Sequence, residues 1–112
     1  MTDDEKMLLV AKACGWTLEP RRAALAGRNC CWCVDLMDYF EPLLNSDITL
    51  EIVTKLDLIM HPDKIHKVAR CWQYIGNVAI SIPANGDMPA ALCRAVFEVA
   101  ATIGATLGAR SG

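Results

Sequence analysis

The C-terminal block from Met88 to Gly112 constrains the fold more than any other part of this chain. It is rich in Ala, Gly, Val and Leu, and its charged residues are only Arg94, Glu98 and Arg110. At about 100° per residue, one narrow arc of a helix collects apolar side chains, namely Leu92, Val96, Val99, Ile103 and Leu107. The opposite side carries Arg94, Glu98, Ala101 and Ala105. This pattern predicts a long core helix that lies on a β-sheet.

The same block is long enough to cross a bilayer, but its composition argues against a membrane role. Arg94 and Glu98 lie within the span, and Ala and Gly contribute little to insertion. Gly104 and Gly108, four residues apart, offer a small-residue face on which another helix can pack closely. We expect that face to pack within the chain, with a homo-oligomer through the C-terminal helix as the alternative.

Length and charge narrow the classes of protein further. A chain of 112 residues is expected to form a single domain, residues 1–112. Hydrophobic residues make up 54% and charged residues 21%, which is typical of a globular protein rather than a disordered one. The net charge is −2 and the basic residues are scattered, so we expect neither direct DNA binding nor mimicry of DNA.

The N-terminal residues point to a cytoplasmic protein. They are acidic, and the apolar run from Met7 to Val10 is shorter than the core of a signal sequence. In the cytoplasm, the six cysteines of this chain are expected to be reduced and mostly buried.

Three of these cysteines, Cys30, Cys31 and Cys33, are clustered. With His61, His66 and Cys71 they could in principle surround a zinc ion. Structural zinc sites normally use two C-x-x-C or H-x₃₋₅-H pairs, whereas here a C-C-x-C run is combined with two histidines that flank a proline turn. We expect no metal and no cofactor, and we interpret the cluster as a half-buried strand. A metal- or thiol-dependent enzyme centred on Cys30, Cys31, Cys33 and His61 is the alternative function.

Hydrophobic periodicity and capping residues predict an α+β fold, in which helices pack on a small antiparallel sheet of three or four strands in an α-β-α sandwich-like arrangement. Asp3 or Asp4 is expected to cap a first helix that runs to about Ala13, and Gly15 is expected to end it. The second is expected to run from a cap at Ser46 or Asp47 to about Leu58.

Strands are expected at residues 30–34, 65–74 and 78–82, with Gly76-Asn77 as the turn of a hairpin. Residues 16–27, 35–45, 59–64 and 83–89 are expected to form loops, because prolines and glycines interrupt each pattern or flank it.

Several segments taken together resemble one family. They are Trp32, Phe40-x-Pro42-Leu43-x-Asn45-x-Asp47, Thr54-Lys55-Leu56, and Cys93-Arg94-Ala95-Val96-x-x-x-Ala100-Ala101-x-Ile103-Gly104. From Trp32 to Gly104 the chain resembles small phage and prophage proteins of the phage ABA-sandwich-domain family. It departs from their pattern at Val96, where isoleucine is usual, and at Thr102, where the family has glutamate. The resemblance implies a sheet with helices on both sides and a viral accessory protein in the host cytoplasm, but no mechanism.

No catalytic motif stands out. His61 and His66 lie at a turn and in a charged stretch, where exposure to solvent is expected. Asp35 and Asp38 flank a loop, and a general acid would need one of them to be buried. The segment 84–87 has a single glycine and an aspartate, which repels phosphate.

The sequence therefore predicts a non-enzymatic phage accessory protein that acts by binding and that inhibits or sequesters a host defence factor. Aromatic residues and arginines dominate interface energetics, and on this basis the candidate binding residues are Trp16, Arg21, Arg22, Trp72 and Tyr74. This set could instead hold a small nucleotide ligand. Alternatively, Trp72 and Tyr74 are core residues on one face of a strand.

Overall fold

The structure, a computed structural model, describes residues 1–22, 29–43 and 45–111. Within these residues there are three helices, α1 (Asp3–Cys14), α2 (Ser46–Leu56) and α3 (Met88–Ser111). One antiparallel sheet consists of β1 (Leu18–Arg22), β2 (Asn29–Cys33) and β3 (Asp38–Tyr39). The other consists of β4 (Leu58–Asp63), β5 (Val68–Gln73) and β6 (Ala79–Pro83). The predicted α+β class and long C-terminal helix are confirmed.

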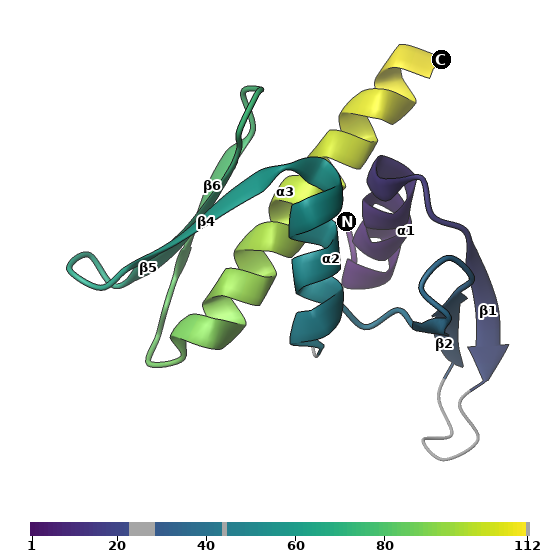
Figure 1. Cartoon of the computed structure of the whole chain (residues 1–112), viewed down its shortest axis with the longest axis horizontal. Coiled ribbons are helices and arrows are strands. Elements are labelled where there is room, and N and C mark those ends of the chain that lie inside the picture. Colours follow the sequence, from purple (N-terminus) through teal and green to yellow (C-terminus); the bar gives the residue numbers. More distant parts are fainter. Residues whose placement is uncertain (23–28, 44, 112) are drawn as a thin grey trace.

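Helix α3 runs through the middle of the molecule, as Figure 1 shows. The β4–β6 sheet lies along one side of it, and α1 and the β1–β3 sheet lie on the other. The expected single sheet of three or four strands is thus two sheets of three. Among the described residues all helices lie on one side of the β4–β6 sheet, in contrast to the two-sided arrangement that the resemblance implies.

The helix caps lie close to their predicted positions. Thr2 caps α1, because its hydroxyl accepts a hydrogen bond from the Glu5 N–H at 3.2 Å, and the predicted Asp3 and Asp4 belong instead to the first turn, where carboxylates favour the helix dipole. Gly15 ends the helix with φ 73°, as predicted.

Helix α2 is capped by Asn45, one residue before the predicted Ser46, and the Asn45 side chain accepts a bond from the Asp47 N–H at 3.0 Å. The helix ends at Leu56, because Asp57 takes a left-handed conformation with φ 51°.

Three strands contradict the predicted loops: the two-residue β3 lies within 35–45, and β1 and β4 each contain a proline. Strand β1 includes Pro20 within the predicted loop 16–27, and β4 includes Pro62 within the predicted turn 59–64. Both strands are at the edge of their sheet. An edge strand tolerates proline because the missing N–H can face away from the neighbouring strand. The prediction was wrong here because proline was interpreted as a local turn signal alone.

Helix α3 is buried on more than one side. Its fully buried residues include Ala95, Val96, Phe97, Val99 and Ala100. The predicted single apolar arc is therefore too narrow, and Leu107, within that arc, is 39% exposed. The segment Met88–Leu107 is long and apolar enough to cross a membrane by length and composition, with a mean hydropathy of 1.5, but a core helix passes the same test.

Gly104 sets the distance between α3 and α1. A Cβ atom at this position would overlap the backbone carbonyl of Leu9 in α1. The small-residue face therefore packs within the chain at Gly104, and the side chains of residues 108–111 lie outside the described ones. A homo-oligomer through this helix stays a prediction.

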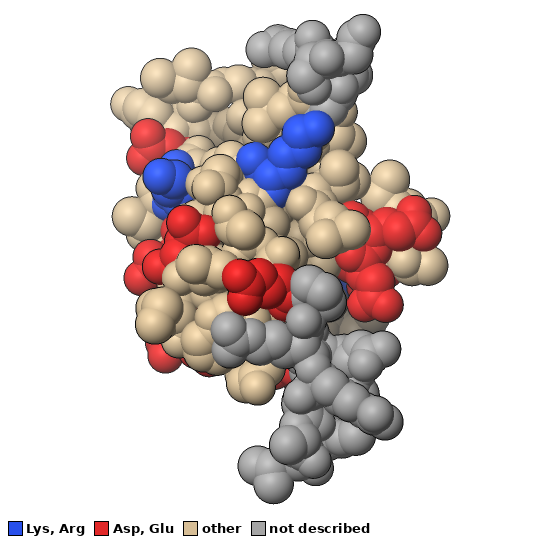
Figure 2. All heavy atoms as spheres, turned by 90° about the vertical axis from the view of Figure 1, so that its right-hand side faces the viewer, with Lys and Arg blue, Asp and Glu red and all other residues tan. Residues whose placement is uncertain are grey.

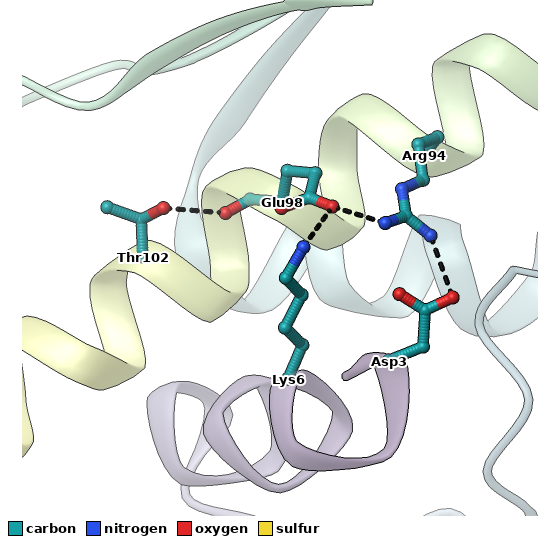
Figure 3. Close-up of polar contacts among 5 residues, drawn as sticks. All are labelled: Asp3, Lys6, Arg94, Glu98 and Thr102. Carbon is teal, nitrogen blue, oxygen red and sulfur yellow. Dashed lines mark hydrogen bonds and ion pairs between the residues drawn. The ribbon is translucent and has the colours of Figure 1, made fainter. Parts of the chain in front are cut away.

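Charges on the side of α3 opposite the predicted apolar arc contact α1 (Figure 3). One carboxylate oxygen of Glu98 lies 2.9 Å from Nζ of Lys6 and 2.6 Å from Nη2 of Arg94. The other terminal nitrogen of Arg94 lies 3.0 Å from Oδ2 of Asp3. The Arg94 hydrogen bond lowers the pKa of Asp3. The contribution of the Asp3–Arg94 pair to stability is therefore present at neutral pH, and it is lost as the pH falls through the lowered pKa of Asp3.

The side of the molecule that lies away from the β4–β6 sheet is acidic. Figure 2 shows the side of the molecule that carries β1 and β2, where separate groups of Asp and Glu outnumber Lys and Arg among the coloured residues. Residues 1–57 contain ten acidic and six basic residues, whereas residues 58–112 contain three acidic and five basic ones. The two halves of the chain therefore have opposite net charge.

We predict that Gly104→Ala destabilises the protein by about 1–3 kcal/mol, because the new methyl group meets backbone that cannot move aside cheaply. The sign of the effect is diagnostic. Helix propensity alone favours Ala over Gly by up to about 1 kcal/mol, so a stabilised variant in urea denaturation would contradict the close approach of α1.

We also predict that Glu98→Ala lowers the free energy of unfolding by about 1–2 kcal/mol, since two half-buried cations lose their shared partner. The matched control is Glu51→Ala on the exposed surface of α2, which should change stability by less than about 0.5 kcal/mol. Equal effects in thermal denaturation would show that the network contributes nothing.

Candidate functional site

The two faces of the β4–β6 sheet have different surroundings. One face packs on the core through Leu58, Met60, Ala69, Cys71, Ile80 and Ile82. The alternation of strand residues and the pairing register place nine residues on the opposite side, and we call it the outer face: Ile59, His61, Asp63, Val68, Arg70, Trp72, Ala79, Ser81 and Pro83. Within the described residues no helix covers the outer face (Figure 1).

Trp72 lies at the centre of the outer face. It is on the middle strand, opposite Ile59 of β4 and Ala79 of β6. Its side chain is half-buried but does not belong to the core cluster or to the residues packed against it, and the same holds for Ile59. The indole therefore lies on the sheet surface beside an aliphatic side chain. Trp72 is therefore not a core residue.

Tyr74 extends this apolar surface beyond the end of β5. Its side chain is 70% exposed, and its backbone N–H donates to the Asp57 carbonyl at 3.0 Å. Beside it lies a shallow hollow of about 420 Å³. The hollow is lined by Val53, Thr54, Asp57, Leu58, Ile59 and Tyr74.

The end of the outer face away from Tyr74 is polar, and its side chains are joined by hydrogen bonds. Asp63 accepts hydrogen bonds from the backbone N–H of His66 at 3.0 Å, from its ring Nδ1 at 2.8 Å and from Nε of Arg70 at 3.2 Å. Arg70 also donates from Nη1 to the Ser81 hydroxyl at 3.2 Å. These contacts join the turn of the β4–β5 hairpin to all three strands of the sheet.

The hydrogen bonds from His66 and then from Arg70 hold the pKa of Asp63 well below its usual value of 3.8. Because its pKa is lowered in the folded state, ionised Asp63 stabilises the folded hairpin at pH values above 3.8. This contribution is lost as the pH falls through the lowered pKa of Asp63. Asp63 therefore stays ionised throughout the physiological range.

The five predicted binding residues do not form one surface. Trp16 packs against the core, with its ring edge-on to Phe40 at 6.0 Å between centroids. Arg21 and Arg22 belong to β1, and their side chains lie outside the described residues. Trp72 and Tyr74 are the two that share a surface.

In the part of the chain that the structure describes, the members of the predicted alternative site are not brought together. Cys33 is fully buried, Cys31 is half-buried, and the Cys30 side chain lies outside the described residues. His61 is exposed on β4, in the other sheet. Among the described residues, no group of three His, Cys, Asp or Glu side chains could hold a metal ion.

Two further thiols are poor nucleophiles. Burial raises the pKa of Cys14 to about 12 and that of Cys71 to about 11, so both are protonated at neutral pH. The Asp35 and Asp38 carboxylates each accept a backbone hydrogen bond at 2.7 Å, from Thr17 and Tyr39 respectively. The two carboxylates thus fix loop geometry rather than sharing a site.

Sequence reasoning missed Ile59 and Asp63 because the segment 59–64 was interpreted as a turn. A signal was available, since Ile59, His61 and Asp63 alternate with Leu58, Met60 and Pro62 as a strand requires. Once β4 is recognised, the partner strand places Ile59 beside Trp72 and His61 beside Arg70.

We predict that the Asp63 carboxyl carbon titrates well below pH 3.8 in an NMR pH series. Replacing His66 by glutamine removes the ring donor and should move the midpoint upward. If His66→Gln leaves the Asp63 midpoint unchanged, the hydrogen bonds do not fix this hairpin turn in solution.

Comparisons with protein-family models, with curated proteins and with solved structures found no match to this chain. Membership of the phage ABA-sandwich family, phage origin and location in the host cytoplasm therefore stay predictions.

Proposed function

We propose that this protein is a non-enzymatic binding protein that docks a partner protein on the outer face of the β4–β6 sheet. The observation that carries the proposal is Trp72, an aromatic side chain on the middle strand of a sheet face that no described helix covers. Tryptophan and tyrosine are the residues most often found at the energetic centre of protein interfaces.

The hollow beside Tyr74 supports the same function. It offers a partner a concave apolar contact next to a flat aromatic one, and a buried anchor side chain surrounded by polar groups is the usual anatomy of an interface. Polar residues, among them His61, Arg70 and Ser81, border the apolar end on the same face.

The narrower role, in which a phage accessory protein inhibits or sequesters a host defence factor, is also a proposal. It rests on the resemblance described above and on the small size of the chain. A metal- or thiol-dependent enzyme is the second candidate. The location of Cys33 in the core and of His61 on the other sheet speaks for the binding function over that enzyme.

The proposal is tested by capture from cells of the source organism, with the tagged protein and quantitative mass spectrometry. We expect wild type to retain a stoichiometric partner that Trp72→Ala and Tyr74→Ala each lose, with an affinity at least about thirtyfold weaker for Trp72→Ala. Tyr74 is largely exposed, so its variant should fold normally even if Trp72→Ala does not.

The matched control is Leu8→Ala, which removes a 59% exposed apolar side chain from α1. This variant should capture the partner as wild type does. If all three variants retain the same proteins, the outer face is not the docking site.

A further inference from the structure

We propose that the partner segment that docks on the outer face is acidic at one end, so that its carboxylates contact the β4–β5 hairpin while an apolar side chain enters the hollow beside Tyr74. This inference rests on the proposed function and specifies the chemistry of the partner. It follows from the way in which charge and apolar surface are arranged along one strand.

Strand β5 and the residues next to it carry two kinds of side chain in order. Lys67 lies in the turn before the strand, Arg70 and Trp72 point to the outer face, and Tyr74 follows the strand. Lys67 and Tyr74 are seven positions apart in the sequence, which at about 3.3 Å per residue is a span of about 23 Å that about seven extended residues of a partner would cover. One end of this strip is cationic and the other is aromatic.

The cationic end has a surplus of positive charge. Lys64 and Lys67 are exposed in the hairpin turn, and Arg70 lies at the same end of the outer face. The carboxylate on this end of the outer face is Asp63, which already accepts three hydrogen bonds from His66 and Arg70. Asp63 therefore neutralises part of the charge, and most of its acceptor capacity is already used.

The side chains of Lys64 and Lys67 are less constrained than that of Arg70. Arg70 is held by Asp63 and Ser81, so its guanidinium is fixed in place before any partner arrives. Lys64 and Lys67 extend from the turn into solvent. A partner with carboxylates at this end would gain charge-assisted contacts with little reorganisation of the sheet.

The hollow at the other end is not suited to carboxylates. Asp57 is part of its lining, together with Val53, Ile59 and Tyr74. An acidic group placed there would be repelled, whereas an aliphatic side chain would bury apolar surface against Ile59 and Tyr74. The two ends therefore select opposite chemistry and give the partner segment a direction.

A single-stranded nucleic acid would also bring negative charge and would stack on Trp72. The observations favour a polypeptide, because half of the residues that line the hollow are aliphatic and because the hollow carries Asp57, which a phosphate backbone would have to approach. A second copy of this chain could bring the acidic side shown in Figure 2. Both occupants are distinguished in the experiment below.

The experiment follows the indole N–H signals of ¹⁵N-labelled protein by NMR. The chain has three tryptophans, so Trp16 and Trp32 serve as internal controls, and Trp72→Phe assigns the signal of Trp72. The probes are capped peptides with a leucine-containing half followed by a run of glutamate, glutamine or lysine, together with a short oligothymidylate.

We expect the glutamate peptide to move the Trp72 signal and to bind about tenfold more tightly than the glutamine peptide, with the lysine peptide weaker still. In the double variant Lys64→Gln/Lys67→Gln this preference should disappear, while binding of the glutamine peptide is unchanged. Lys12→Gln, in the exposed last turn of α1, should keep the preference.

Equal binding of the glutamate and glutamine peptides at Trp72 would overturn this inference and leave the docking face intact. Tighter binding of oligothymidylate, or a Trp72 signal that moves with protein concentration alone, would also overturn it, in favour of a nucleic acid or a second copy. If no probe moves the Trp72 signal and the capture experiment also shows no effect of Trp72→Ala, the proposed function itself fails.

Discussion

The close approach of α1 to α3 at Gly104 is the contact on which the rest of the structure depends. Because no side chain separates the Leu9 backbone from α3 at this point, the two helices form one unit, and the shared ion pairs of Glu98 lie beside it. Because α1 covers one side of α3, the other side of α3 can pack against a sheet. The β4–β6 sheet packs there, and α3 becomes the centre of the core.

This arrangement also determines which surface is left for function. Helices α1 and α2 both pack on α3, so none of the described helices reaches the other side of the β4–β6 sheet. Side chains that alternate with the core residues of β5 therefore face outward, and Trp72 is among them. A large aromatic group that could have been part of a second core layer instead lies on the surface of the sheet.

Parts of the fold that depend on local signals were predictable. The end of α1 at Gly15 requires a left-handed residue, and the length of α3 follows from an unbroken apolar pattern. Proline misled the prediction at β1 and β4, because a residue that breaks a central strand is tolerated at an edge. Of the candidate site, Trp72 and Tyr74 were named from the sequence, whereas Trp16 packs against the core and Ile59 was missed.

The sequence by itself determined the α+β class, the long apolar helix and which residues share a face in the strands that were predicted, because these depend on periodicity along the chain. Only the tertiary structure decided what covers each face. The charged side of α3 meets α1 through a contact between Lys6 and Glu98, 92 residues apart, and such a contact leaves no local pattern. The outer face of the β4–β6 sheet is exposed for the same reason, because its exposure is a property of where the helices pack.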